Sequence, residues 1–294
     1  MNAGQIKSVF LTFALLVAVS ACGAESKKKA KKPKANEVAP GVLHLGRIAH
    51  PHITESSGVV VSRQFPGVFW THNDGGGGRK QVLYGMTREG KPLAELYVSG
   101  ALLLDWEDIA IDGEHHLFIG DIGNNDAKRA HLAVHQIDEP DPKADRSEAP
   151  IKRSWQLHFP AAPFDCESLF IWRDHGYVIS KVFNDQRAEI YRFPLTAQKE
   201  PFVLEFVARL KIDSPVTGAD ISADGRLLGI VAHSGAFVYR IDGDVAAAAK
   251  LKPHHTKFKD EHIEGCCFVP EGLYATSESR DIYLFIDPAF HPAK

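Results

Sequence analysis

The feature that most constrains the fold is a sequence plan that occurs five times, at intervals of about 50 residues. Each copy has a small or acidic start, a short apolar run, a turn, a second apolar run and a polar end. The copies span residues 55–74, 105–124, 165–184, 216–235 and 262–279. Aligned on Ser57, Glu107, Glu167, Thr217 and Glu264, they lie 50, 60, 50 and 47 residues apart, and the long interval contains a Pro- and Asp-rich insertion at 138–150. Such a period indicates a repeat architecture rather than unrelated domains.

Each repeat continues with two further segments of strand character, so that one repeat supplies four strands. Short runs rich in β-branched and aromatic residues, bounded by Gly, Pro, Asp and Asn, are typical of strands. These runs lie at 81–87, 93–99, 131–137, 152–159, 188–193, 203–212, 236–242 and 252–258. Outside the N-terminal apolar run, helical character is expected only as a turn at 244–250. Four antiparallel strands make one blade of a β-propeller, so the sequence predicts an all-β propeller domain.

The fifth repeat is one strand short, and a spare strand lies at the other end of the chain. After 262–279 only the run 281–286 follows, whereas the run 42–49 precedes the first repeat. Pairing of 42–49 with the last blade would close the ring and remove open strand edges, which favour aggregation. We therefore predict five blades closed by an N-terminal strand. A six-bladed ring with one degenerate blade remains the alternative, because spacing alone does not distinguish the two.

Residues 1–21 have the organisation of a signal peptide. Lys7 precedes an apolar run at 9–21, which is too short to span a bilayer as a helix and has the length of a signal-peptide core. The run ends in Val19-Ser20-Ala21-Cys22, which resembles the lipobox of bacterial lipoproteins. That resemblance implies that Cys22 is acylated, with palmitate among its chains, and becomes the first mature residue. Three acyl chains would form a stable membrane anchor.

Residues 22–40 and 41–294 differ sharply in composition. The first segment contains six lysines, two prolines and no aromatic residue, which predicts a disordered tether. The second carries 27 basic and 35 acidic side chains, a net charge of −8, which argues against nucleic acid and favours cations as partners. Gly23 stands where aspartate would favour inner-membrane retention. We therefore expect an outer-membrane anchor in the cell envelope, with a monomeric domain in the periplasm or at the cell surface.

Polar residues recur where, in a propeller, the first strand of each blade begins and the second ends. One column of such residues contains Glu107, Glu167 and Glu264, with Ser57 and Thr217 in the other repeats. Two positions earlier stand Glu55, Asp105 and Asp165, and the second-strand ends add His72, Asp74, Asp121, Asn124, Lys181 and His233. Because residues i and i+2 of a strand share a face, we expect these side chains to converge at one mouth of the central channel.

Converging carboxylates repel one another, so either some have a raised pKa or a cation neutralises them. Ca²⁺ suits such a mouth, because it binds six to eight oxygen atoms in a flexible shell. We predict Glu107, Glu167 and Glu264 as Ca²⁺ ligands. The residues expected to bind a ligand around them are Asp105, Asp165, Glu55, His72, Asp74, Asp121, Asn124 and His233. A hydrated hydrogen-bond network and direct acid–base catalysis by these acids remain alternatives.

Several common functional motifs are absent from the sequence. The glycines at 75–78 are followed by Arg79 and Lys80 rather than by Lys and Ser or Thr, so they do not form a P-loop, and neither G-x-S-x-G nor H-E-x-x-H occurs. After lipidation three cysteines remain: Cys166, Cys266 and Cys267. An odd number leaves at least one without an intramolecular partner, and we expect all three to be small buried residues.

The motifs WTHNDGG, DWEDIA with FIGDIGNN, VTGADISADGRLL and GLYATSES resemble those of secreted bacterial β-propeller proteins of unassigned activity, over residues 50–285. The D-x-E element is also similar to that of calcium-containing propellers of the phytase-like and gluconolactonase/paraoxonase-like groups. This resemblance implies that Glu107, Glu167 and Glu264 are channel metal ligands. The chain departs from the pattern at Ser57 and Thr217.

Two functions from different classes follow. In the first, the polar face binds a small-molecule or protein ligand, with Ca²⁺ in the channel. In the second, the protein is a Ca²⁺-dependent hydrolase of an ester, lactone or phosphoester, with His72 or His233 as the base. The first is the preferred hypothesis, because neither histidine has an identifiable partner in the sequence.

Overall fold

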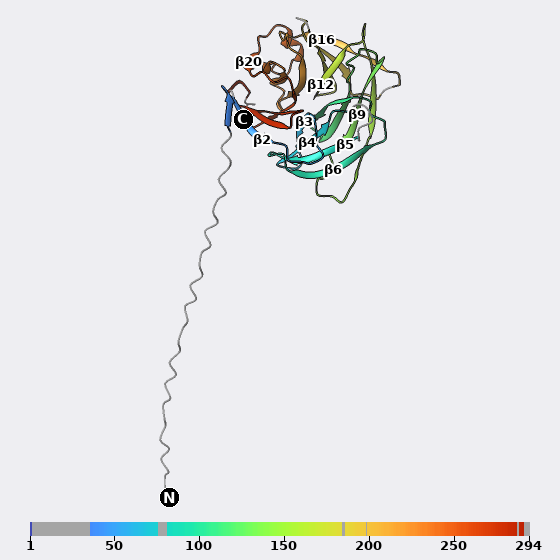
Figure 1. Cartoon of the computed structure of the whole chain (residues 1–294). Coiled ribbons are helices and arrows are strands. Elements are labelled where there is room, and N and C mark those ends of the chain that lie inside the picture. The colour runs from blue at the N-terminus through green and yellow to red at the C-terminus, as the bar shows by residue number, and fades with distance from the viewer. Residues whose placement is uncertain (2–35, 76–80, 184–185, 198, 287, 291–294) are drawn as a thin grey trace. The chain divides into compact units, whose positions relative to one another are not determined.

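The protein is a five-bladed β-propeller (Figure 1). The computed structural model describes Met1 and residues 36–75, 81–183, 186–197, 199–286 and 288–290. The predicted signal peptide and Cys22 therefore lie outside the described residues. Among the helices of the described part, none is long and apolar enough to cross a membrane.

The blades follow one another along the chain. Blade 1 contains β3 (Ser56–Val61), β4 (Val68–Asn73), β5 (Val82–Thr87), β6 (Pro92–Ser99) and β10 (Glu148–Pro150). Blade 2 contains β7 (Trp106–Ile111), β8 (His116–Asp121), β9 (His131–Asp138), β11 (Arg153–His158) and β15 (Phe202–Val203). Blade 3 contains β12 (Asp165–Trp172), β13 (His175–Lys181), β14 (Glu189–Pro194) and β16 (Glu205–Arg209). Blade 4 contains β17 (Val216–Ile221), β18 (Leu227–Ala232), β19 (Gly235–Arg240) and β20 (His254–Lys257). Blade 5 contains β21 (Ile263–Val269), β22 (Gly272–Ser277), β23 (Asp281–Phe285), β2 (Val42–Arg47) and β1 (Asn36–Ala39).

The innermost strands close the ring. Each of β3, β7, β12, β17 and β21 contacts the innermost strands of both neighbouring blades, and β21 of the last blade contacts β3 of the first. The spare N-terminal strand pairs where predicted: β2 lies antiparallel to β23, with Val42 opposite Phe285 and Leu43 opposite Leu284. In Figure 1, β2 lies beside the red C-terminal strands of the same blade. The five-bladed prediction is confirmed, and the six-bladed alternative is wrong.

Two outer strands, β1 and β10, come from segments that the sequence did not mark as strands, and a third, β15 (Phe202–Val203), overlaps the predicted run 203–212 by one residue. β1 pairs antiparallel with β2, so regular structure begins at Asn36, inside the segment expected to be tether. The insertion at 138–150 ends in β10, which pairs in parallel with β6 of blade 1. The connection after β14 contributes β15, parallel to β11 of blade 2. Each added strand covers the outer edge of a blade, and an uncovered edge exposes unpaired backbone groups.

Burial follows position within the blade. The second strands β8 and β18 are buried along almost their whole length, because blades pack against both of their faces. The outer strand β6 alternates between exposed and buried residues near its end, since it packs on fewer neighbours. The three cysteines are buried and unpaired, as predicted. The helical turn expected at 244–250 is the 3-10 helix η1 (Val245–Ala249), which Asp244 caps by accepting a hydrogen bond from the Ala246 N–H at 3.0 Å; a second, η2, spans Pro288–Phe290.

Candidate functional site

The first strand of every blade carries a β-bulge at the same place. Its pairing with the second strand skips at Ser57, Glu107, Glu167 and Thr217, and in the last blade between Ile263 and Cys266, where Glu264 lies. A bulge adds a residue to one strand and re-aims its side chain, and bulges are common next to active sites. The column found in the sequence is therefore a column of bulges around one mouth of the channel.

Two members of the column join neighbouring blades rather than offering charge to the channel. The Ser57 hydroxyl donates to the Glu107 carbonyl oxygen at 2.6 Å, and the Thr217 hydroxyl donates to the Ile263 carbonyl oxygen at 2.6 Å. Both hydroxyls are buried together with their acceptors. Blades 1 and 4 thus use this position for hydrogen bonds to the next inner strand.

The three glutamates of the column are all nearly buried at the mouth and influence one another electrostatically. Glu107, Glu167 and Glu264 are only 6, 5 and 7% exposed. Burial, followed by the negative charge of Glu167, raises the pKa of Glu107 and of Glu264 well above the ordinary range. Their mutual repulsion shows that these side chains share one electrostatic environment at the mouth.

Lys181 neutralises one of the three. Its ammonium group, at the end of β13, donates to Glu167 Oε1 in a buried ion pair. Burial raises the pKa of Glu167 to about 7, although Lys181 opposes the shift. The second oxygen of Glu167, Oε2, is buried and has no hydrogen-bond partner among the described residues.

Among the described residues, a group of acids close enough to share one metal ion differs from the predicted set of ligands. Carboxylate oxygens of Asp74, Asp105 and Glu107 all lie within 4.8 Å of one another. Asp74 follows β4 of blade 1, whereas Asp105 and Glu107 belong to the start of β7 in blade 2. Burial, followed by the charge of Asp74, raises the pKa of Asp105 to about 6. The structure therefore groups Glu107 with two acids predicted only as surrounding binding residues, and not with Glu167 and Glu264.

Gly123 fits its backbone against this group, which we name the acid triad (Asp74, Asp105 and Glu107). A Cβ atom at position 123 would lie 2.2 Å from Glu107 Oε1 and 2.4 Å from Asp105 Oδ2. Any side chain at position 123 would therefore displace these two carboxylates. The side chain of Glu107 makes no hydrogen bond to any other residue that the structure describes. Its nearly buried carboxylate lies close to those of Asp74 and Asp105.

Asp121, Asn124 and Asp165 hold the mouth together. Asp121 accepts hydrogen bonds from the Leu104 and Asp105 N–H groups at 3.2 and 2.8 Å and pairs with Arg129 at 3.0 Å. Asp165 Oδ1 accepts the Asn124 N–H at 2.7 Å, which ties blade 3 to blade 2. Asp121 and Asn124 were predicted to bind ligand, and the structure instead shows their polar atoms engaged within the protein.

His72 is a structural residue, and its predicted role as a catalytic base is wrong. The ring is fully buried and stacks on Trp106, with centroids 4.1 Å apart. Nε2 accepts the Gly58 N–H at 3.1 Å, and Nδ1 lies 2.9 Å from the Asn73 carbonyl oxygen, to which it donates. Burial lowers the pKa of His72 to about 3. Both nitrogens are occupied, so the ring has no lone pair for a substrate or a metal.

His233 and Glu55 stay at the mouth and remain partly accessible. His233 is half-buried, and burial, then the nearby Lys181 charge, lowers the pKa of its ring. Glu55 is half-buried, and its carbonyl oxygen accepts the Asp74 N–H at 3.1 Å. Glu55 therefore borders the acid triad, and His233 lies near Lys181.

The sequence interpretation missed an apolar rim beside the mouth. Leu102 and Leu104, which directly precede Asp105, are 77 and 57% exposed, and Phe183, two residues after Lys181, is 52% exposed. The Lys181 ammonium lies 6.0 Å from the centre of the Phe183 ring. The signal was present as the run Leu102-Leu103-Leu104, which lacks strand alternation and adjoins a predicted site residue.

Fold and site together define a five-bladed propeller with an acidic channel mouth. The sequence matches no known protein family and no curated protein. Among solved structures, the chain is similar to hydrazine synthase of Kuenenia stuttgartiensis (11% identity, 80% of this chain and 72% of that chain covered, TM-score 0.45). It is also similar to a putative gluconolactonase (15% identity, 84 and 79% covered, TM-score 0.45) and to virginiamycin B lyase of Staphylococcus aureus (12% identity, 78 and 65% covered, TM-score 0.43). These likenesses indicate neither an activity nor a ligand for this chain.

Proposed function

We propose that the channel mouth binds Ca²⁺ and that the protein is a ligand-binding propeller anchored in the cell envelope. The observation that carries the proposal is the acid triad, whose ligand oxygens lie within 4.8 Å of one another around the nearly buried Glu107. Such like charges are unfavourable unless protons or a cation neutralise them. Glu107 is nearly buried and makes no side-chain hydrogen bond to another described residue, which favours a neutralising cation.

The chemistry of the donors fits Ca²⁺. All three are carboxylates, and hard cations such as Ca²⁺ prefer oxygen ligands in a flexible shell of six to eight. A bound ion would neutralise the triad and offer its remaining positions to water or to oxygen atoms of a ligand. The close approach of Gly123 supports the fit, because it leaves the two carboxylates of blade 2 free of any intervening side chain.

Ligand binding is favoured over hydrolysis because His72 cannot act as a catalytic base. His72 has both nitrogens engaged within the protein, so the mouth lacks that base. The apolar rim of Leu102, Leu104 and Phe183 instead offers a ligand an apolar surface beside the acid triad. The ligand class that fits is an oxygen-rich molecule with an apolar part.

Anchoring in the envelope is proposed from the sequence. The ending Val19-Ser20-Ala21-Cys22 and the lysine-rich segment after it support a lipid on Cys22 and a tether that holds the propeller away from the membrane, in the periplasm or at the surface. The outer membrane is the proposed location, because Gly23 stands at the position of the retention aspartate.

Calorimetric titration of CaCl₂ into chelator-treated full-length protein tests the proposal. Glu107→Gln keeps the shape of the side chain, removes its charge and should weaken Ca²⁺ binding at least about tenfold, or 1.4 kcal/mol. Asp145→Asn, on the exposed insertion, is the matched control and should bind as wild type does. Glu264→Gln distinguishes the two ligand sets, because the acid triad does not include Glu264. Wild-type affinity in Glu107→Gln, or no Ca²⁺ binding at all, would contradict the proposal.

A further inference from the structure

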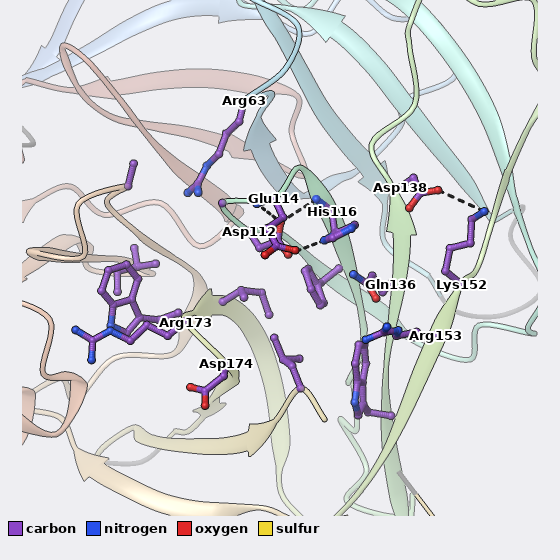
Figure 2. Close-up of a pocket in the computed structure, with 18 of the residues that line it drawn as sticks. Arg63, Asp112, Glu114, His116, Gln136, Asp138, Lys152, Arg153, Arg173 and Asp174 are labelled. Atoms are coloured by element: carbon purple, nitrogen blue, oxygen red, sulfur yellow. Dashed lines mark hydrogen bonds and ion pairs between the residues drawn. The ribbon is translucent and has the colours of Figure 1, made fainter. Parts of the chain in front are cut away.

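A large cavity lies at the end of the strands opposite the acidic mouth. The inner strands run away from the mouth, and the turns that follow them line this cavity: Asp112–His116 after β7, Trp172–Asp174 after β12 and Ser222–Ala223 after β17. Its volume is about 870 Å³, within the range of pockets that hold small organic ligands. The close-up in Figure 2 shows charged side chains around it.

Most of the acidic side chains around this cavity have an ion-pair partner within the protein. Asp112 Oδ2 lies 2.8 Å from His116 Nδ1, and Oδ1 accepts the Glu114 and His116 N–H groups, both at 2.8 Å. Asp138 pairs with Lys152 at 3.3 Å. Asp174 pairs with His175 at 2.8 Å. Glu114 is the one lining carboxylate without such a partner among the described residues.

Three arginines of the same cavity are not engaged in this way. Within the part of the chain that the structure describes, the guanidinium groups of Arg63, Arg153 and Arg173 make no ion pair and no hydrogen bond. Arg63 comes from the β3–β4 turn, Arg153 from β11 and Arg173 from the β12–β13 turn, and Figure 2 shows them on different sides of the cavity. Arg173 lies over the Trp172 ring, 5.3 Å from its centre. Unpaired guanidinium groups offer forked donors that match carboxylate and phosphate oxygens.

A buried amide adds a neutral polar group to the wall. Gln136 on β9 is only 8% exposed, and its side chain has no hydrogen-bond partner among the described residues. Because this amide lines the cavity, it can donate and accept hydrogen bonds with water or a ligand there. The side chains of Phe118, Trp155, Ile171 and Leu195 form the apolar part of the lining.

We infer that this cavity is a second ligand site, distinct from the acidic mouth, and that it binds an organic anion. The apolar lining receives a flat or apolar body, Arg63, Arg153 and Arg173 bind its carboxylate or phosphate, and Gln136 satisfies a further polar atom. The inference goes beyond the proposed Ca²⁺ site and does not depend on it, because the two sites lie at opposite ends of the inner strands. An inorganic anion alone would leave most of the cavity and its apolar wall unused.

The test uses three probes of similar size: phenyl phosphate, phenylacetate and the neutral benzyl alcohol. Each is titrated into full-length protein by calorimetry in the presence of chelator. We expect saturable binding of at least one anion, with benzyl alcohol at least about tenfold weaker, and the stronger anion identifies the acidic group. The double variant Arg63→Gln/Arg153→Gln should weaken anion binding at least about tenfold. Arg240→Gln removes an exposed arginine of β19 that does not line the cavity, and should bind as wild type does.

The outcomes separate this site from the mouth. Glu107→Gln should bind the anions unchanged, and loss of anion binding in that variant would place the anion at the mouth and overturn the inference. The inference is equally overturned if no anion binds up to its solubility limit, or if benzyl alcohol binds as tightly as the anions. Full anion affinity in a folded double variant would also overturn it. If the double variant melts at a lower temperature than wild type, the single variant Arg153→Gln replaces it in the test, because Arg153 is exposed and its loss should not disturb the fold. Full anion affinity in that variant would then overturn the inference.

Discussion

The raised pKa of the buried Asp220 predicts that the stability of the fold depends on pH. It lies on the inner strand β17, where Oδ2 accepts the Phe268 N–H of blade 5 and Oδ1 accepts the Ile221 N–H, both at 2.8 Å. Burial raises the pKa of Asp220 from 3.8 to about 6, although these N–H groups and Arg63 oppose the shift. The perturbation is Asp220→Asn, which keeps the shape and removes the titration.

The direction of the change in folding stability with pH follows from the number of protons that each state binds. Between about pH 4 and 6 the folded state holds a proton on Asp220 that the unfolded chain has released, so folding stability falls as pH rises through this window. A shift of about two units corresponds to about 3 kcal/mol for a fully buried group. Asp220 retains some exposure, so we expect about 2 kcal/mol. The asparagine offers one acceptor where the carboxylate offers two, and the lost hydrogen bond costs about 1–2 kcal/mol at every pH.

The assay is urea unfolding of wild type and Asp220→Asn at intervals from pH 4 to 8. The variant should be less stable by about 1–2 kcal/mol at pH 4 and should equal or exceed the wild type at pH 7.5. Taking the difference cancels the titration of groups distant from Asp220. Asp108, whose pKa Asp220 raises, also contributes to it, with the same sign. A stability difference that stays constant from pH 4 to 8 would refute the reasoning, and one that grows in favour of the wild type would reverse it.

Three further predictions concern closure, His72 and anchoring. Deleting 42–47 should lower the melting temperature severely because it removes β2 from the last blade, whereas deleting 23–34 should change it little; equal melting temperatures would contradict closure by β2. His72→Gln keeps an acceptor for the Gly58 N–H and should retain Ca²⁺ binding. His72→Ala should lose about 3–5 kcal/mol of stability in denaturant unfolding, because it leaves the Gly58 N–H unpaired, removes the stacking on Trp106 and creates a cavity. Cys22→Ser should stop incorporation of labelled palmitate and release the protein from the membrane fraction, and continued labelling of that variant would disprove acylation at this residue.

The sequence predicted the blades because each inner strand obeys local rules. Runs such as 106–111 on a first strand and 227–232 on a second strand are buried throughout and mostly apolar, since other blades cover both of their faces, and turns rich in Gly and Asp separate them. The outer strands β10 and β15 obey no such rule. Glu148–Pro150 and Phe202–Val203 are short and partly polar, and they become strands only because the edge of a neighbouring blade lies beside them. Pairing of that kind depends on three-dimensional proximity and leaves no periodicity in the sequence.

The cavity opposite the mouth was not predictable for a related reason. Arg63, Arg153 and Arg173 stand 90 and 20 residues apart, in turns or on an outer strand, and no spacing rule connects them. The bulge column was visible because it recurs once in every repeat. Residues that recur can be aligned, whereas a site assembled once from unlike positions of three blades has no internal copy with which to compare it.

The same distinction explains why the column was visible in the sequence whereas the acid triad was not. Repetition pointed to Glu107, Glu167 and Glu264 as equivalents because each occupies the same place in its repeat, whereas the members of the acid triad occupy different places. Neighbouring blades approach closely: the Gly75 N–H donates to the Trp106 carbonyl oxygen at 3.1 Å, which brings Asp74, at the end of β4, beside Asp105 and Glu107. Lys181 meanwhile neutralises Glu167. Among the described residues, the seam between blades 1 and 2 is therefore where the end of a second strand and the start of the next first strand bring three carboxylates closest together. A cation bound there would be held asymmetrically, with Glu264 outside its immediate group, and this asymmetry is what the comparison of Glu107→Gln with Glu264→Gln measures.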